Sequence, residues 1–362
     1  MKLHSAVKQA IASRKGREVL FALVCFLSPM LLAPAMANVG NTLVWTQDPT
    51  FEGWGAVTRL CAVAAQKGTI SYAVLSAHGI YRNSGIGNPW VPVIDGLPEG
   101  GLGQVRVRAF SVAPDEPLTV YVGLISVNPG RPSLYRSRDG GTSWTVLAGL
   151  TDRRVHALGV PVGQPSWVYA ATEGQLYRSV DRGMTWEARG GWSGAAEVLC
   201  MAISPQDPDN VYLGTSGQGL LTTIDGGRSW GRGLPGTRVF ALALGQREGV
   251  LYAGTDSGLY GTEDGGGTWQ VRGDEWTGQR VYAVAVSPTD DGTLYLGIED
   301  EGVYRSFDGG QEWIALKRGM GNATVRALAV DPGDPWLIRA GSGNGLWRCA
   351  LYLPEGHPLA AP

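Results

Sequence analysis

The 362-residue sequence is poor in the residues that carry metal and nucleophilic chemistry in enzymes. It holds only four histidines and four cysteines, and these form no cluster with metal-ligand spacing. It also lacks a Gly-x-Ser-x-Gly segment and a glycine loop that would hold phosphates at the start of a helix. These absences argue against a metalloenzyme, a serine hydrolase and a nucleotide-binding enzyme. We expect no metal and no cofactor.

An excess of positive charge is also missing. The 30 Lys and Arg residues are balanced by 32 Asp and Glu residues, which gives a formal net charge of −2 and argues against a broad nucleic-acid-binding surface. Beyond the first 37 residues there is no long apolar run. We therefore expect membrane contact only through the N-terminal segment. We also expect the chain to be a monomer.

The first 37 residues have the pattern of an export signal. An apolar run over residues 19–32 ends close to Ala35, Met36 and Ala37, which are small enough to form a cleavage site. The mature chain is then expected to begin at Asn38, in the periplasm or outside the cell. The alternative is an uncleaved anchor, although the run is short for a spanning helix. The basic residues before the run are Lys2, Lys8, Arg14, Lys15 and Arg17.

The cysteines outside this signal are too few and too scattered to staple a fold. Cys61, Cys200 and Cys349 are an odd number, and each falls in a predicted strand. We expect free thiols in blades 1, 4 and 7 of the repeat described next, rather than a disulfide or a metal site.

The chain is rich in turn-forming residues and shows an internal repeat of four short strands. It has 54 glycines and 21 prolines and no long helical pattern. One clear unit has strands at 280–286, 293–297 and 302–306, and a fourth strand that opens at Trp313. Four short strands per repeat are typical of a propeller blade.

The turn between the third and fourth strands recurs with the pattern Ser/Thr-x-Asp-x-Gly-x-Ser/Thr-Trp. On these residues the chain resembles the Asp-box (BNR) repeat families, which include sialidases, xyloglucanases, sortilin ectodomains and photosystem II assembly factors. The resemblance implies a propeller fold but no single function. The five copies run over residues 137–144, 179–186, 223–230, 262–269 and 306–313.

The aspartates of these turns are expected to be structural. An Asp side chain can accept hydrogen bonds from its own turn, Gly can take positive φ, and Trp can pack between blades. Two units depart from the pattern, with Glu312 in place of the hydroxyl residue and Gly85 in place of the aspartate. The structural aspartates are Asp139, Asp181, Asp225, Asp264 and Asp308.

Counting the tryptophans predicts an all-β, seven-bladed β-propeller with four antiparallel strands per blade. Six units are complete, and the seventh, from Thr324, lacks a fourth strand. Residues 42–46 read as that missing strand, so the N-terminal strand is expected to close blade 7 and leave no open edge. The propeller is expected to cover residues 38–353, followed by a short tail at 354–362. The six box tryptophans are Trp90, Trp144, Trp186, Trp230, Trp269 and Trp313.

Arginines recur at the start of the first strands, which should lie innermost and open at the upper mouth of the central channel, opposite the aspartate turns. Blades 4 and 7 carry Glu197 and Thr324 there. Such a ring suits a carboxylate, sulfate or phosphate; the alternative is an internal network of ion pairs with neighbouring carboxylates. The aligned arginines are Arg59, Arg106, Arg154, Arg238 and Arg280. Two positions later come Arg108, His156, Tyr282 and Arg326.

Three tryptophans outside the turns, Trp54, Trp192 and Trp276, fall in blade-to-blade links on this upper face. Exposed indoles there would stack on sugar rings or anchor a protein partner. The alternative is that each indole covers the end of its own blade.

Three functions remain open. The leading hypothesis is an exported, non-catalytic binding or scaffold propeller that engages a protein segment or an anionic ligand at the upper channel mouth. In architecture the chain resembles the photosystem assembly factors, which are single seven-bladed propellers. The second is a glycoside hydrolase, although xyloglucanases usually carry two such propellers and the sialidase Arg-Ile-Pro segment is absent. The third is a purely structural surface module. The carboxylates to test for hydrolysis are Glu173, Glu197, Glu299 and Asp300.

Overall fold

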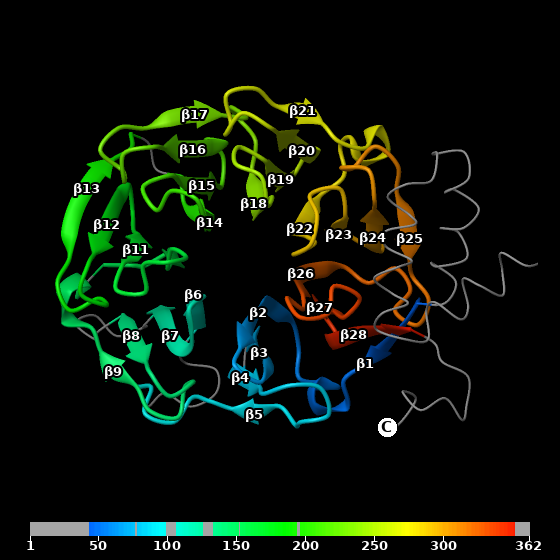
Figure 1. The fold of residues 1–362 in the computed structure, drawn as a ribbon, viewed down its shortest axis with the longest axis horizontal. Coiled ribbons are helices and arrows are strands. Elements are labelled where there is room, and N and C mark those ends of the chain that lie inside the picture. Colours follow the sequence, from blue (N-terminus) through cyan, green and yellow to red (C-terminus); the bar gives the residue numbers. More distant parts are fainter. Residues whose placement is uncertain are drawn as a thin grey trace, which may run out of the picture. The chain divides into compact units, whose positions relative to one another are not determined.

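In the computed structural model, seven four-stranded sheets stand around a central axis (Figure 1). The structure describes residues 43–76, 78–98, 106–125, 133–151, 153–193 and 196–351. The expected export segment and C-terminal tail lie outside the described residues. This ring confirms the predicted seven-bladed β-propeller. Among the described residues, we find no helix with the length and apolar character needed to cross a membrane.

The blades follow each other along the chain, each running from an inner to an outer strand. Blade 1 consists of β2 (Val57–Ala65), β3 (Gly68–Leu75), β4 (Gly79–Asn83) and β5 (Val91–Pro92). Blade 2 consists of β6 (Arg106–Ala113), β7 (Glu116–Ile125), β8 (Leu134–Ser137) and β9 (Thr145–Val146). Blade 3 consists of β10 (Ala157–Gly159), β11 (Val168–Ala171), β12 (Gln175–Ser179) and β13 (Glu187–Gly191). Blade 4 consists of β14 (Val198–Ile203), β15 (Val211–Thr215), β16 (Leu220–Thr223) and β17 (Gly231–Gly233).

The remaining three blades complete the ring, and the described residues include three short 3-10 helices in the links. Blade 5 consists of β18 (Val239–Leu244), β19 (Leu251–Thr255), β20 (Gly258–Thr262) and β21 (Gln270–Val271). Blade 6 consists of β22 (Val281–Val286), β23 (Leu294–Ile298), β24 (Gly302–Ser306) and β25 (Ile314–Leu316). Blade 7 consists of β26 (Val325–Val330), β27 (Ile338–Ser342), β28 (Gly345–Leu351) and β1 (Leu43–Gln47). The helices are η1 (Pro49–Phe51), η2 (Ala148–Leu150) and η3 (Asp274–Trp276).

Strand β1 closes blade 7, as the sequence predicts. It pairs with β28 as the outer strand of that sheet. The Trp45 indole Nε1 donates a 2.7 Å hydrogen bond to the carbonyl of Leu316 in blade 6, and the Trp45 amide donates to Arg318 O at 2.8 Å. Beyond the strand, the Asp48 amide bonds Leu346 O at 2.8 Å. The first strand of the chain thus joins its last sheet and fastens it to blade 6.

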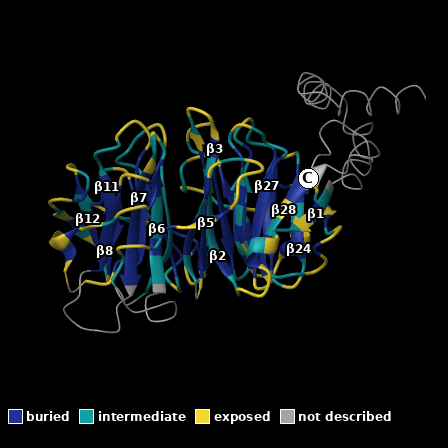
Figure 2. Ribbon diagram, turned by 90° about the horizontal axis from the view of Figure 1, so that it is seen from below, coloured by how far each residue is buried: buried dark blue, intermediate teal, exposed yellow. Residues whose placement is uncertain are grey.

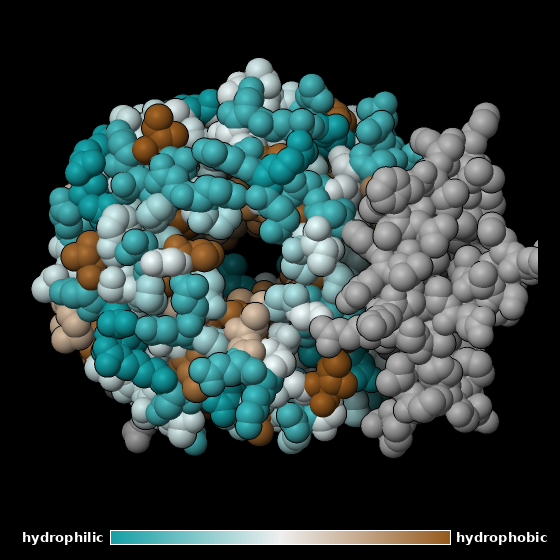
Figure 3. Space-filling model, in the orientation of Figure 1, coloured by the Kyte–Doolittle hydropathy of each residue, from teal (hydrophilic) through white to brown (hydrophobic). Residues whose placement is uncertain are grey.

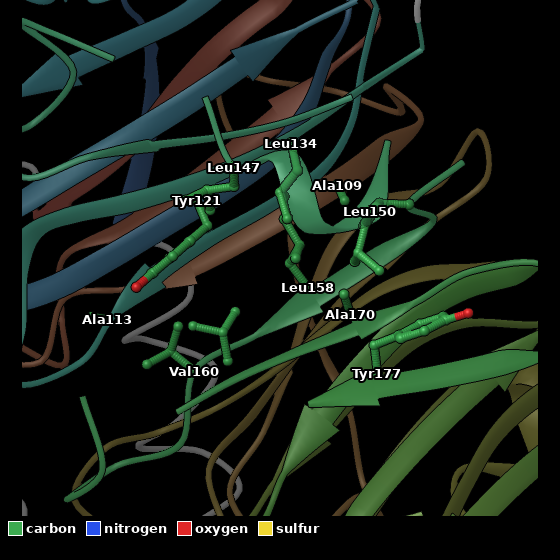
Figure 4. Close-up of a cluster of buried hydrophobic side chains, with 12 residues drawn as sticks. Ala109, Ala113, Tyr121, Leu134, Leu147, Leu150, Leu158, Val160, Ala170 and Tyr177 are labelled. Atoms are coloured by element: carbon green, nitrogen blue, oxygen red, sulfur yellow. The ribbon is translucent and has the colours of Figure 1, made fainter. Parts of the chain in front are cut away.

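The hydrophobic core lies between neighbouring blades, where the buried strands form the interior of the ring (Figure 2). Figure 4 shows one such cluster, in which Leu134 and Leu147 of blade 2 pack with Leu158 and Ala170 of blade 3. Burying apolar surface of this kind stabilises a fold by about 25 cal/mol per Å². Because each cluster joins two blades, stability is shared around the ring.

In each of the five aspartate turns, the Asp carboxylate accepts a hydrogen bond from a backbone amide of its own turn. In the first of them, Asp139 accepts hydrogen bonds from the Ser143 hydroxyl at 2.6 Å and the Ser143 amide at 2.9 Å. These bonds lower the pKa of Asp139 to about 2. The Ser137 hydroxyl also donates to Asp139, at 2.8 Å. The carboxylate is used to close its own turn.

The three cysteines are free and lie in strands β2, β14 and β28 of blades 1, 4 and 7, as expected. Burial raises the pKa of Cys61 to about 12, and that of Cys349 likewise. These thiols stay protonated at neutral pH and are poor nucleophiles.

Candidate functional site

A β-bulge recurs near the start of the inner strand in six of the seven blades. In blade 5, Val239 pairs with Thr255 and Ala241 pairs with Gly254, so Phe240 between them has no partner. A bulge redirects the side chain of its extra residue. We call this place the bulge position, and the place two residues earlier the entry position. The bulge positions are Thr58, Arg108, Leu199, Phe240, Tyr282 and Arg326, with His156 at the matching place in blade 3.

The inner strands of all seven blades surround a cavity of about 420 Å³ in the central channel. Its lining includes Thr58, Phe240, Tyr282 and Arg326 from bulge positions. The space-filling view shows the opening at the centre of the ring (Figure 3). We call the entry and bulge positions together the channel mouth.

The predicted arginine alignment is wrong for blade 1. The carbonyls of Arg238 and Arg280 accept from Asp256 and Glu299, and in blade 1 the equivalent carbonyl is that of Ala56, bonded by Ser76. Arg59 pairs opposite Val74, three residues further along, where blade 5 has Ala241. The entry positions are Ala56, Arg106, Arg154, Glu197, Arg238, Arg280 and Thr324. The side chain of Arg106 lies outside the part of the structure that is described.

Glu197 is the centre of the most connected charge cluster at the mouth. It forms an ion pair with Arg108, and its Oε1 lies 3.0 Å from His156 Nδ1. The Glu197 amide donates a 3.0 Å hydrogen bond to Ser216 Oγ, which fixes the start of the strand. Burial lowers the pKa of His156, and the positive charge of Arg108 lowers it further. A neutral imidazole can therefore donate its Nδ1 proton to Glu197.

The other carboxylates of the mouth are also paired. Glu173 Oε1 lies 3.8 Å from His156 Nε2 and 3.9 Å from Arg154 Nε. Glu299 accepts from Arg280 at 3.1 Å and from the Tyr282 hydroxyl at 2.9 Å. This pairing with Glu299 raises the pKa of Arg280.

Asp300, the fourth carboxylate expected to matter for hydrolysis, has a different partner. Its carboxylate accepts a 2.6 Å hydrogen bond from the Thr324 hydroxyl, and its amide donates one of 3.0 Å to the same oxygen. Of the two interpretations of the arginine ring, the internal ion-pair network describes Arg108, Arg154 and Arg280.

Three arginines of the predicted ring have no ion pair with any described carboxylate. Arg238 bonds the Ser216 carbonyl through Nε at 3.3 Å. Arg326 stacks on the Tyr282 ring at 4.6 Å. Arg59 donates from Nη2 to the carbonyl of Arg108 at 2.8 Å.

The three link tryptophans fall into two classes. Trp54 is 38% exposed and stacks against His78 and Tyr81. Trp192 and Trp276 are each 7% exposed. They pack edge-on against the turn tryptophans Trp230 and Trp313, respectively. Of the two alternatives, the covered indole describes Trp192 and Trp276, whereas Trp54 is the exposed one of the three.

The mouth combines neutralised charges, hydroxyl groups and aromatic edges. Glu173 and Glu197 approach the two nitrogens of one imidazole, and glycoside hydrolysis requires carboxylates roughly 5 to 10 Å apart. Within the described ranges, no group of three or more His, Cys, Asp or Glu side chains is arranged to hold a metal ion.

The ring and its mouth define the chain as a seven-bladed β-propeller with an open central channel and a polar mouth. No protein-family model matches it. It is 30% identical over 251 residues to the oligoxyloglucan-reducing end-specific xyloglucanase of Emericella nidulans, a match that covers 66% of this chain and 26% of that enzyme. A xyloglucanase from Paenibacillus sp is 24% identical over 288 residues, covering 70% of this chain and 24% of the enzyme. The chain thus spans about a quarter of the curated relatives it matches.

Solved structures share the fold. The GH74 xyloglucanase from Xanthomonas campestris superposes with a TM-score of 0.66 at 21% identity, covering 88% of this chain and 55% of that one. YCF48 from Cyanidioschyzon merolae superposes with a TM-score of 0.63 at 17% identity, covering 84% of this chain and 98% of that one. A structure of YCF48 bound to D1 peptide gives 0.62 at 14% identity, with coverages of 85% and 96%. At these identities the likeness establishes the propeller fold.

Proposed function

We propose that this chain is an exported glycan-directed propeller whose channel mouth binds a neutral, hydroxyl-rich oligosaccharide of the xyloglucan type. The observation that carries the proposal is the pairing of Glu173, Glu197 and Glu299 with arginines at the mouth. Paired charges leave little net field for an anion, but each pair keeps free donors and acceptors for sugar hydroxyls. The curated relatives that act on xyloglucan support this ligand class. We also propose that the repeated turns are Asp boxes.

Glu173 and Glu197 are the carboxylates we assign to hydrolysis, should the bound glycan be cleaved. They flank His156 at an open mouth, and Glu173 is 58% exposed. Both side chains are already engaged by arginines, Glu173 by Arg154 and Glu197 by Arg108, so neither is free to act on a glycosidic bond without breaking an ion pair. The geometry therefore favours binding over turnover.

Calorimetric titration with a xyloglucan oligosaccharide tests the proposal, with reducing-sugar release measured in parallel. We expect binding that is lost in Glu173→Gln and Glu197→Gln and kept in Arg228→Gln, an exposed arginine in one of the aspartate turns on the opposite face. Release of sugar that both glutamate variants abolish would assign hydrolysis to this pair. Absence of both binding and release would overturn the proposal.

A second candidate is a scaffold that captures an acidic protein segment. It is favoured by Arg238, an exposed arginine at an entry position that forms no ion pair with a described carboxylate. Anisotropy with a labelled hexaglutamate peptide tests it. Charge reversal by Arg238→Glu, alone and with Arg280→Glu, should weaken capture by at least tenfold. Unchanged capture would exclude this candidate while leaving the glycan proposal standing.

A further inference from the structure

The interior of the channel differs in charge from its mouth. Among the described residues that line the 420 Å³ cavity, two are arginines, Arg59 and Arg326, and none is an aspartate or glutamate. At the mouth, Arg108, Arg154 and Arg280 have glutamate partners, but the two arginines that line the cavity have none among the described residues.

Arg59 reaches the chamber because of its register. Its place in the inner strand is taken by Ala109 in blade 2, Ala241 in blade 5 and Ala283 in blade 6. The small residues of the other blades leave room for one long side chain, and Arg59 occupies it. Arg59 is therefore a long, charged residue at a place where blades 2, 5 and 6 have alanine.

Most of the hydrogen-bonding capacity of Arg59 is unused. Its one hydrogen bond to the described residues runs from Nη2 to Arg108 O, at 2.8 Å, and a guanidinium carries five N–H groups. Burial lowers the pKa of Arg59, and the charge of Arg108 adds to this. The group still remains charged, because guanidinium does not lose its proton in proteins.

Arg326 is the second cation of the chamber. Its bulge position brings it over the Tyr282 ring, with its Cζ 4.6 Å from the ring centroid, and none of the described carboxylates forms an ion pair with it. A stacked guanidinium keeps its edge N–H groups free for an anion.

The rest of the chamber wall is mainly apolar. Phe110, Leu158, Phe240 and Met201 line it, with few hydroxyl groups. A volume of about 420 Å³ lies within the range of small-molecule sites, roughly 300 to 1,000 Å³. An incompletely paired, desolvated cation beside an apolar wall is complementary to a ligand with one anionic group and an apolar body.

We propose that the channel interior binds a small amphiphilic organic anion, whose charged head lies at Arg59 and Arg326 and whose apolar body lies along Phe240 and Leu158. Carboxylates and sulfate esters share this chemistry. None of the three mouth glutamates that carry the proposed function lines this cavity, so the site does not depend on that function.

Titration calorimetry with octanoate, octyl sulfate below its micelle concentration, octanol and inorganic sulfate tests the site on the full chain. We expect at least one of the two amphiphilic anions to bind at least tenfold more tightly than octanol and inorganic sulfate. Comparison of octanoate with octyl sulfate then shows whether the site prefers a carboxylate or a sulfate ester. Equal binding of octanol, or of inorganic sulfate, would overturn the proposal.

Matched variants locate the site. Arg59→Met keeps side-chain length but removes the charge, and it should weaken binding of the anion by about tenfold, the worth of one charge-assisted hydrogen bond. Arg154→Gln, at the mouth beside Glu173, should leave that affinity unchanged. Should Arg59→Met fail to fold, Arg326→Gln, at the second arginine of the cavity lining, gives the same readout. Unchanged affinity in a folded variant of either chamber arginine would refute the site.

Discussion

Gly341 in β27 packs directly against Val57 in β2, so the last blade meets the first through a glycine and a valine. A Cβ atom added to Gly341 would lie 2.7 Å from Val57 Cγ1, far inside normal contact. The same contact recurs between other neighbouring blades. The equivalent pairs are Gly214 with Val239, Gly254 with Val281 and Gly297 with Val325. Glycines on the second strands thus allow neighbouring blades to pack this closely.

Replacing Gly341 with alanine should destabilise the ring. The new methyl group would force the Val57 contact apart, and overpacking of this kind costs about 1–3 kcal/mol. Gly343→Ala is the matched control, because a Cβ there meets nothing within 4 Å. Denaturant unfolding of the two variants provides the comparison, and equal midpoints would show that blade spacing tolerates the methyl.

Replacing Trp45 with alanine should open the closure of blade 7. Trp45 is 2% exposed and bonds blade 6 through its indole, and truncating a buried tryptophan costs about 3–5 kcal/mol. Deleting residues 38–50 should destabilise the whole ring further. Thermal melting measures both, with Trp54→Ala, at an exposed indole, as the control. A deletion variant that melts like the parent would refute closure by β1.

The aspartate turns predict how stability changes with acid. The pKa of Asp139 is lowered to about 2 by the bonds from Ser143, whereas an unfolded aspartate titrates near roughly 3.9. A carboxylate with a depressed folded pKa contributes stability that is present above the unfolded pKa and lost as pH falls through the folded one. The free energy of unfolding should therefore fall between about pH 4 and pH 2. In Asp139→Asn this loss should be smaller. Denaturant unfolding at a series of pH values measures it, and an identical decrease in the variant and the parent would contradict the role of Asp139.

Removing acids from the mouth should turn it into an anion site. Glu173→Gln and Glu299→Gln together would leave Arg154, Arg280 and their neighbours without counter-charges. We expect the double variant to be retained on a heparin column to higher salt than the parent, with a retention that salt screens. Glu52→Gln, at an exposed acid outside the mouth, is the control for total charge. Equal retention of parent and double variant would show that the paired acids do not neutralise the mouth.

The sequence predicts the architecture well because the same four-strand unit recurs along the chain. Tryptophan spacing counts the blades, and Trp45 alone marks the strand that closes the ring. The contact between Gly341 and Val57 is not among the predictions from the sequence. The recurrence of glycine at the same place in second strands, and of valine at the start of first strands, is the pattern that indicates it.

The site was less predictable because it depends on one-residue register and on contacts across blades. Arg59 stands where the repeat has alanine, so aligning charges shifted it by three positions. Trp192 is covered because it packs edge-on against Trp230, and this contact between residues far apart in the sequence has no local sequence pattern. The pairing of Glu197 with Arg108 joins blades 4 and 2 and likewise has no short sequence pattern.

Closure by β1 also determines how the ring would respond to mechanical force. In blade 7, Gln47 Nε2 bonds the Asn344 carbonyl, so the end of β1 lies beside the start of β28 and the two strands run in opposite directions. The start of β1 and the end of β28 therefore lie toward the same end of the ladder. A pull that separated these ends would load the hydrogen bonds one after another, as in a zipper, instead of all together in shear. Tension would open this propeller at a single seam and leave six blades stacked.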